Sequence, residues 1–302
     1  MHGFINLDKP LGITSHDAVA QLRRTLKRAG VPAKVGHAGT LDPLATGVLI
    51  LCVGSATRLS EYVMAERKVY EAIIQLGSAT STYDAEGEVT FQADASAIQA
   101  EQVLAVLPRF TGTIDQLPPA YSAIKQGGKK LYELARQGVE VTLTPRRVTL
   151  ESLSLSAWEQ TYQRFHLRVV CSAGTYIRSL AHDIGQALGV GAHLAGLRRM
   201  ASGAFDVSRS HQMEQLQTLD AIQSALIAPA QALADWQSLV LTAEQVADVR
   251  QGRMIQHELA ASTSEPEVLA LGVDAQGDLV ALLRAEAGQW KPHKVFQLSS
   301  ET

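Results

Sequence analysis

The chain has 302 residues, of which 46% are hydrophobic, and a formal net charge of −3. That length supports a large core and exceeds one ordinary compact domain, so we expect a large domain with a smaller one attached. No apolar run approaches the roughly 20 residues of a membrane-spanning helix, and the N-terminus lacks a secretory signal pattern. Cys52 and Cys171 both lie in apolar runs and are interpreted as buried thiols of a reduced, cytoplasmic protein.

The charge is unevenly distributed along the chain. Residues 1–60 carry 7 Lys and Arg against 3 Asp and Glu, whereas residues 120–150 and 160–211 each carry 6 against 2. Residues 212–302 carry 5 against 12. Phosphate backbones are bound by local positive surface, so a negative net charge does not exclude a nucleic-acid partner. Chance clustering is the alternative.

Hydrophobic periodicity and turn residues predict the elements in chain order. The chain is expected to begin with a strand at 3–7 and a helix at 16–29 capped by Ser15, followed by a Gly-rich loop at 35–47 and strands at 48–53 and 69–76. A turn at 84–87 then leads into another strand. After it we expect a helix near 98–107 with Val103, Leu104 and Leu107 inward, a strand at 119–125 and a short helix at 130–136.

The C-terminal half is expected to begin with strands at 147–155 and 164–171, a helix at 175–188 capped by Thr175, and a hairpin at 194–207. Helical sequence follows at 212–235. The last part is expected to contain a helix from Thr242 to Gly252 and strands at 268–273, 279–283 and 293–298. Strands and helices do not alternate regularly. We therefore expect an α+β fold with a mixed, largely antiparallel central sheet flanked by helices. Residues 1–235 would form one domain and residues 239–302 a small β-rich module.

Asp42 is the first candidate functional residue. It lies in GHAGTLDPLATG at residues 36–47, and Pro43 forces it into an extended backbone. The flanking glycines allow close approach of another backbone, so the carboxylate would be presented on a stiff loop beside a buried strand. A structural Asp-Pro turn is the alternative. A metal site is disfavoured because neither HExxH nor CxxC occurs in the sequence.

Arg178 is the second candidate. Residues 171–185 read CSAGTYIRSLAHDIG, and helical spacing places Arg178 in the first turn of a helix. A cation there opposes the helix dipole at a cost of about 0.3–1 kcal/mol, which a carboxylate or phosphate partner would offset. We expect Arg178 to pair with Asp42 and keep it ionised. A surface arginine without a role is the alternative.

Cations and aromatic residues are interleaved in PPAYSAIKQGGKKLYELARQG at residues 118–138, a combination that suits phosphates and bases together. The cations are Lys125, Lys129, Lys130 and Arg136, and the aromatic residues are Tyr121 and Tyr132. A solvated basic helix is the alternative.

Together these segments resemble the TruB family of bacterial tRNA pseudouridine-55 synthases. The resemblance covers residues 3–18, 35–51, 68–87, 118–138, 171–185 and 197–205, in the family's order. It implies the pseudouridine synthase fold and a PUA-type RNA-binding module from about residue 239. It also implies no cofactor and no metal. One departure is Thr80-Ser81-Thr82, where the family usually has Thr-Asp-Thr, which leaves the role of that acid open here.

The resemblance also implies roles for individual residues. Asp42 matches the essential aspartate, and Arg178 matches the arginine that pairs with it. Tyr70 matches the tyrosine that stacks on the target base and is a candidate for proton transfer. The substrate-binding residues that it implies are Lys9, His37 and Tyr176, to which the basic segment adds Lys125, Lys129 and Lys130.

The expected reaction is therefore the isomerisation of uridine 55 in the T-loop of tRNA to pseudouridine, after the base has been flipped from its stack. Asp42 would either attack the sugar covalently or remove a sugar proton. We expect tRNA as the partner, no guide RNA, no membrane, and a monomer. The alternatives are a tRNA-folding chaperone and a small-molecule nucleosidase, although the sequence offers no convincing second acid for the latter.

Overall fold

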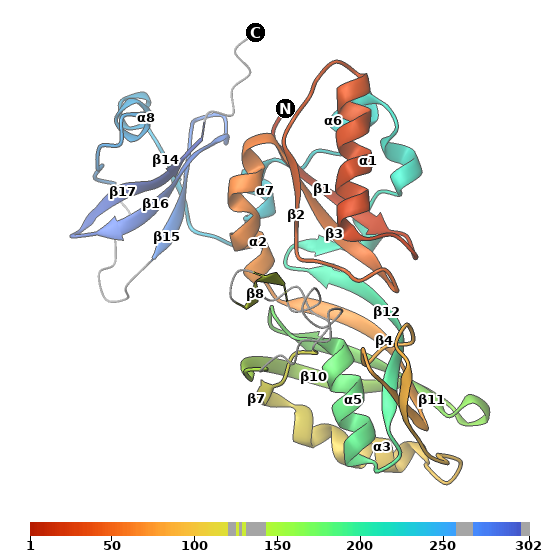
Figure 1. Cartoon of the computed structure of the whole chain (residues 1–302). Helices are drawn as coiled ribbons and strands as arrows, with labels where there is room; N and C mark the ends of the chain where they lie inside the picture. The colour runs from red at the N-terminus through yellow and green to blue at the C-terminus, as the bar shows by residue number, and fades with distance from the viewer. Residues whose placement is uncertain (120–124, 127–128, 131–142, 258–267, 297–302) are drawn as a thin grey trace. The chain divides into compact units, whose positions relative to one another are not determined.

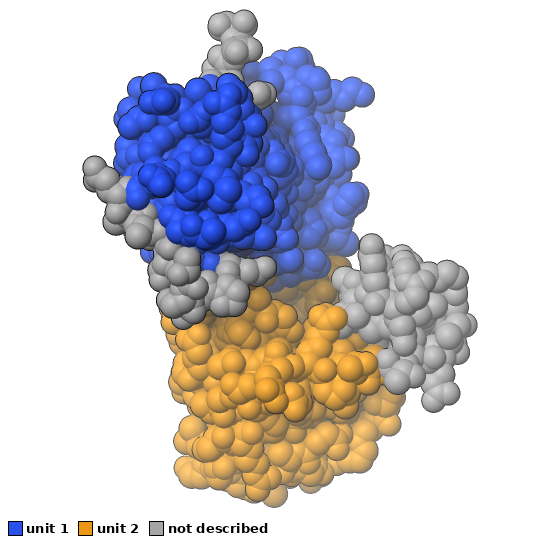
Figure 2. Space-filling model, turned by 90° about the vertical axis from the view of Figure 1, so that its left-hand side faces the viewer, with its two compact units in different colours: residues 1–41, 48–64, 204–302 blue, residues 42–47, 65–203 orange. Residues whose placement is uncertain are grey.

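Figure 1 shows the computed structural model, which describes residues 1–119, 125–126, 129–130, 143–257 and 268–296. The chain forms two compact units, coloured separately in Figure 2. Unit 1 comprises residues 1–41, 48–64 and 204–302, and unit 2 comprises residues 42–47 and 65–203.

Unit 2 is built on a mixed sheet. Its strands lie in the order β3 (Ala45–Val53), β12 (Ala192–Ser202), β4 (Lys68–Leu76), β11 (Arg164–Cys171), β10 (Arg146–Glu159) and β7 (Gly112–Gln116). Strand β12 pairs in parallel with the first residues of β3, and the other neighbours in this order are antiparallel. The prediction of a mixed, largely antiparallel sheet is confirmed.

Two helices of unit 2 flank this sheet. Helix α5 (Ile177–Ala187) packs against β12 and β4, and α3 (Ala100–Val106) lies beside α5. The inward face of α5 is apolar because Leu180, Ala181 and Ile184 recur at helical spacing, and all three are fully buried. In α3 the prediction for Leu104 is wrong, because half of this residue is exposed. The inward residues are Val103, Val106 and Leu107.

The remaining elements of unit 2 are short. They are the hairpin β5 (Ser78–Thr80) and β6 (Val89–Gln92), the 3₁₀ turns Leu107–Phe110 and Gln160–Tyr162, and the strands β8 (Lys125–Gln126) and β9 (Lys129–Lys130). Strands β8 and β9 pair with each other in antiparallel fashion. The strand predicted at 119–125 and the helix predicted at 130–136 lie almost entirely outside the described residues.

Unit 1 begins with the N-terminal segment. Its elements are β1 (Gly3–Lys9), α1 (Ser15–Arg28), β2 (Val35–Ala38), the remainder of β3, a 3₁₀ turn at Gly54–Leu59 and α2 (Ser60–Ala65). Strand β2 pairs with β3, so the loop predicted at 35–47 is wrong in its first four residues. Thr14, and not Ser15, caps α1, because Thr14 and Asp17 form a reciprocal capping box.

The C-terminal part of unit 1 starts with the short strand β13 (Phe205–Asp206) and short helical segments. These are Val207–Arg209, Met213–Leu216, α6 (Leu219–Ser224) and α7 (Pro229–Ala232). A four-stranded sheet follows, formed by β14 (Ser238–Val240), β15 (Leu269–Val273), β16 (Leu279–Glu286) and β17 (Gln289–Val295), with α8 (Ala243–Arg250) beside it. The predicted capping box of Thr242 and Gln245 begins α8. The prediction of a small β-rich module is confirmed.

The module has a core of its own around Trp290, which is 1% exposed and packs with residues such as Leu239 and Leu283. It also shares a second apolar cluster with the N-terminal segment, in which Leu271 and Phe296 join Phe4. Unit 1 therefore extends across the boundary expected near residue 239. The division into domains at 1–235 and 239–302 remains a proposal.

Candidate active site

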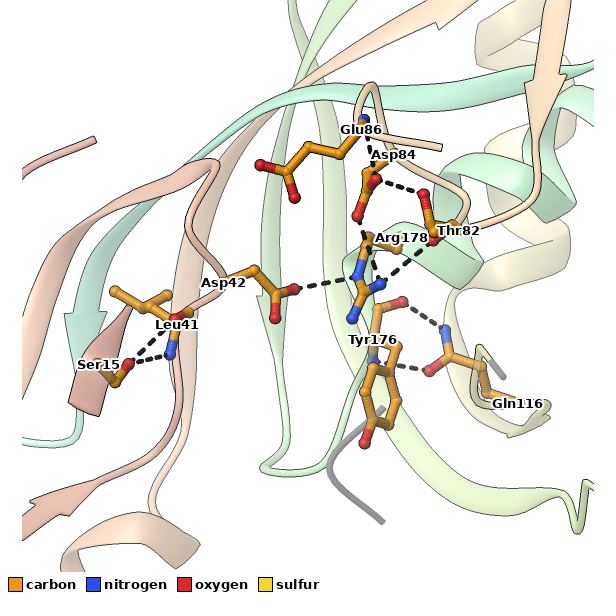
Figure 3. Close-up of polar contacts among 9 residues, drawn as sticks. All are labelled: Ser15, Leu41, Asp42, Thr82, Asp84, Glu86, Gln116, Tyr176 and Arg178. Atoms are coloured by element: carbon orange, nitrogen blue, oxygen red, sulfur yellow. Dashed lines mark hydrogen bonds and ion pairs between the residues drawn. The ribbon is translucent and has the colours of Figure 1, made fainter. Parts of the chain in front are cut away.

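Asp42 is held by its backbone on both sides. The preceding residue, Leu41, donates its N–H to the Ser15 hydroxyl at 2.8 Å, and that hydroxyl donates back to the Leu41 carbonyl at 3.0 Å (Figure 3). The Asp42 carbonyl accepts from the N–H of Ala45 at 3.0 Å, which closes the turn that contains Pro43. Ser15 is 2% exposed, so this clamp is shielded from water. The Asp42 carboxylate is thereby presented on a fixed loop with 38% of its side chain exposed.

Arg178 joins that carboxylate to a second one. Its Nε lies 3.0 Å from Oδ2 of Asp42, and its Nη1 lies 3.3 Å from Oδ2 of Asp84 (Figure 3). Nη1 also donates to the carbonyl of Thr82 at 3.2 Å. The predicted pairing of Arg178 with Asp42 is present. The two carboxylates supply the negative partners that a cation in the first turn of a helix requires.

Asp84 has a contact that the sequence alone did not reveal. This carboxylate is 4% exposed, and its Oδ1 accepts from the Thr82 hydroxyl at 2.5 Å and from the N–H of Glu86 at 3.1 Å. Each oxygen therefore has a partner, as a buried charge requires. In the sequence, this residue could be noticed only as an acid three positions after Ser81, where the TruB family usually has an aspartate. Asp84 therefore anchors Arg178 through a different guanidinium nitrogen from the one that contacts Asp42.

The departure at Ser81 is accommodated locally. The Ser81 hydroxyl accepts from the N–H of Glu88 at 3.2 Å, and the Ser81 N–H donates to the Glu88 carbonyl at 2.9 Å. An aspartate at this position could accept the same hydrogen bond through its carboxylate. Serine therefore still closes the turn that carries Asp84.

Tyr70 lies on β4, where it pairs with Arg199 of β12 and Val169 of β11. The tyrosine is 8% exposed, and its burial raises the pKa of the phenol. The charge of Arg199 and its hydrogen bond to Tyr70 lower this pKa, whereas the charge of Asp42 raises it. Tyr70 therefore lies within the electrostatic reach of Asp42, and its phenol is protonated at neutral pH.

Arg199 and Lys68 form a buried cationic pair beside Tyr70, and the sequence patterns had indicated neither residue. Arg199 is 1% exposed and Lys68 is 4% exposed. Burial, and secondarily the charge of Arg199, lowers the pKa of Lys68 to about 8. The Lys68 ammonium donates to the Glu66 carbonyl at 2.5 Å. The charge of Arg199 therefore acts on both Lys68 and Tyr70 and lowers the pKa of each.

Tyr176 has a defined structural contact. Its N–H donates to Oε1 of Gln116 at 2.8 Å, and its carbonyl accepts from Nε2 of the same amide at 3.0 Å (Figure 3). Tyr176, and not Thr175, is the residue that precedes α5, so the predicted cap is wrong. The Thr175 hydroxyl instead donates to the Ser172 carbonyl. Gln116 is 3% exposed and fixes the backbone two residues before Arg178.

Lys9 and His37 belong to unit 1. The Lys9 ammonium is fully buried and donates to the carbonyls of Pro10 and Ile13, at 2.9 and 2.7 Å. It thus closes the loop after β1. His37 is partly buried on β2, opposite Leu51 of β3. Their roles in substrate binding remain predictions.

The basic segment is described only in part. Lys125 lies opposite Lys130 in the β8–β9 pair, and Lys129 lies opposite Gln126. Tyr121, Tyr132 and Arg136 lie outside the described residues. Across the part of the chain that the structure describes, three or more His, Cys, Asp or Glu side chains do not gather as metal ligands. In that same part, no helix has the length and apolarity needed to cross a membrane.

Almost the whole chain resembles two solved structures. One, the structure of an H/ACA RNP bound to a substrate RNA containing 2'-deoxyuridine, is 25% identical with a TM-score of 0.72 and covers 98% of this chain and 85% of that one. Another, a Cbf5-Nop10-Gar1 complex, is 27% identical with a TM-score of 0.73, and covers 98% of this chain and 84% of that one. The chain shares the fold of these two structures, and its match to a pseudouridylate synthase family model gives the class of the protein.

Sequence comparison gives the family. Residues 23–177 match the TruB family pseudouridylate synthase N-terminal domain, residues 178–235 the tRNA pseudouridylate synthase B C-terminal domain, and residues 236–297 the tRNA pseudouridine synthase II C-terminal domain. A protein of Geobacter sulfurreducens named tRNA pseudouridine synthase B is 41% identical over 96% of this chain and 95% of its own. A relative of the same name from Dechloromonas aromatica is 51% identical over 72% of this chain and 71% of its own. The chain belongs to the TruB family.

Proposed function

We propose that this chain isomerises uridine 55 in the T-loop of tRNA to pseudouridine and that Asp42 is the carboxylate that acts on the nucleoside. The tRNA substrate is supported by relatives named tRNA pseudouridine synthase B that align with most of this chain. The single observation that carries the role of Asp42 is its partly exposed carboxylate, which is held by an arginine that is itself anchored on buried Asp84.

The proposed reaction breaks the N1–C1′ bond of uridine and joins C5 of the uracil to C1′. The proton on C5 leaves and N1 gains a proton, so that substrate and product are isomers. Positive charge develops on the sugar as the first bond breaks, and an ionised carboxylate beside it lowers the barrier. Asp42 is the ionised carboxylate in this proposal. It acts either by attacking the sugar or by removing a sugar proton.

Arg178 has an orienting role in this proposal. Its guanidinium is planar and can hold a carboxylate on each of two edges, so the position of Asp42 is fixed relative to Asp84. Because the Asp42 carboxylate is already charged and oriented, it need not be rearranged during the reaction as solvent water would be, and the barrier is lower. Tyr70 would stack on the flipped uracil, where a base–aromatic contact contributes about 1–3 kcal/mol.

RNA binding is proposed for two further parts of the chain. His37 and Tyr176, together with Lys125, Lys129 and Lys130, would contact the T-arm, whereas Lys9, whose ammonium is buried, would contribute to substrate binding by closing the loop after β1. The module from residue 239 would act as a PUA-like RNA-binding element. We propose that the chain works as a monomer in the cytoplasm without a guide RNA. The H/ACA RNP is an assembly of the structural neighbour.

The test is to incubate the purified chain with unmodified tRNA and with an isolated T-arm stem-loop. We expect tritium release from 5-tritiated uridine in both, and a single pseudouridine at position 55 in the tRNA. Pseudouridine at another position would refute the assignment to the T-loop. Tight tRNA binding without tritium release would instead support the tRNA-folding chaperone, and release that requires an added RNA would support a guided enzyme.

A further inference from the structure

The turn that carries Asp84 is attached to α5 at two points, one helical turn apart. The first is Arg178, which binds the Thr82 carbonyl and the Asp84 carboxylate. The second is His182, four residues later on the same helix, which contacts the intervening Tyr83. The Tyr83 and His182 rings are stacked, with centroids 4.0 Å apart and planes inclined by 16°. Residues four apart lie on the same face of a helix, so one face of α5 holds the whole segment 82–84.

Tyr83 occupies a strained backbone conformation. Its φ is +64°, in the left-handed region that non-glycine residues enter at a cost of order 1–3 kcal/mol. The Tyr83 carbonyl accepts from the N–H of Leu194 at 3.0 Å, and the Leu194 carbonyl accepts from the N–H of Ala85. The backbone is thus held from the sheet side, whereas the ring is held from the helix side by His182. Such a conformation persists only where the surroundings favour it.

His182 is suited to a stacking contact. Burial lowers the pKa of its imidazole, so the ring is neutral at neutral pH. Within the described residues, its Nδ1 is buried and has no hydrogen-bond partner. The contact that the structure gives this side chain is therefore with the Tyr83 ring, and stacked aromatic pairs contribute about 0.5–1.5 kcal/mol beyond their buried area.

We propose that His182 is a positioning residue for the uridine isomerisation. By holding the Tyr83 ring, it stabilises the left-handed backbone at that residue and thereby keeps the Asp84 carboxylate on Arg178. Loss of the stack would let the turn relax toward negative φ, and Arg178 would then lose its buried anchor and hold Asp42 less firmly. This inference rests on the proposed role of Asp42. His182 itself contacts neither Asp42 nor the substrate in this scheme.

The first experiment compares His182→Ala with His182→Phe in single-turnover pseudouridine formation on tRNA. We expect His182→Ala to lower the rate about tenfold while tRNA affinity stays within twofold, because RNA contacts are unchanged. His182→Phe restores a flat ring and should recover the rate to within about twofold of the parent. Gln186→Ala, an exposed change on the same helix, is the matched control and should have no effect.

The second experiment tests whether His182 acts through Tyr83. Tyr83→Leu removes the stack from the other side, so the double variant with His182→Ala should be no slower than the slower single variant. The inference would be overturned by any of three results. These are a double variant whose rate loss equals the product of the two single losses, a His182→Ala variant with the rate of the parent, or a His182→Phe variant as slow as His182→Ala. These outcomes presuppose an active parent chain, whereas a parent without tritium release would contradict the proposed function itself.

Discussion

Nε of Arg178 lies 3.0 Å from Oδ2 of Asp42, although the arginine side chain is 8% exposed and the aspartate side chain is 38% exposed. The same guanidinium is bonded to Asp84, whose side chain is 4% exposed. The partly exposed Asp42 is therefore oriented by the buried Arg178, and Arg178 is itself fixed by the buried Asp84. The exposed end is available to a substrate, and the buried end supplies the rigidity.

Asp42→Asn removes the negative charge and leaves a side chain of the same shape. We expect turnover on tRNA to fall below detection, because the amide can neither attack the sugar nor remove a proton from it. The dissociation constant for tRNA should stay within a few-fold, since the loop is held by Ser15 and Ala45. Tritium release and filter binding measure the two quantities. Asp115→Asn, a surface change on β7, is the control.

Arg178→Lys keeps the charge but replaces the planar group with a point charge that cannot span two carboxylates. We expect kcat to fall by about two orders of magnitude, within the range that positioning of a reacting group contributes. Arg178→Met should in addition lower the free energy of unfolding by about 3–5 kcal/mol, because the Asp84 charge is left buried without its partner. Chemical denaturation checks this value. Arg168→Lys, at an exposed pair with Glu71, should change neither quantity.

Tyr70→Phe and Tyr70→Leu separate the ring from the hydroxyl. The phenylalanine keeps the stacking surface, so we expect tRNA affinity within about threefold and a rate lower by about 10²–10⁴ if the phenol transfers a proton. The leucine should also weaken tRNA binding, by about 1–3 kcal/mol. Equal rates for the parent and Tyr70→Phe would rule out proton transfer by this group. Tyr162→Phe, at a residue that is 60% exposed, serves as the control.

Lys68 makes stability depend on pH in a calculable direction. Its pKa falls from an ordinary 10.5 to about 8 in the folded protein, so between these values the unfolded chain binds more protons than the folded chain. The free energy of unfolding contributed by this group therefore rises with pH through that window and is lowest below pH 8. Each pKa unit corresponds to about 1.4 kcal/mol. The free energy of unfolding of the parent, minus that of Lys68→Met, should thus increase by about 3 kcal/mol between pH 8 and pH 10.5. Urea titrations at the two pH values measure this difference. A flat difference would mean that Lys68 keeps its ordinary pKa when folded.

The sequence by itself determined the periodic elements. The apolar spacing in 177–184 predicted helix α5, and strand β4 at Lys68–Leu76 lies where a strand is predicted at 69–76. The motifs around residues 42 and 178 indicated the family, which the comparisons show. At element ends the sequence predicts less well: it indicates Ser15 as a helix cap, whereas the Ser15 hydroxyl bonds the backbone of Leu41. A hydroxyl can satisfy either role, and local sequence does not distinguish them.

Only the tertiary structure decided how Asp42, Asp84 and Arg178 meet. These residues come from a loop after β2, a turn between β5 and β6, and the start of α5, so their contact depends on strand order and register. The same holds for Tyr83 and His182, 99 positions apart in the sequence, whose stacking follows from where the turn meets the helix. Periodicity reports which face of an element is buried. It carries no information on which distant side chain will lie against that face, because that is set by packing across the whole sheet.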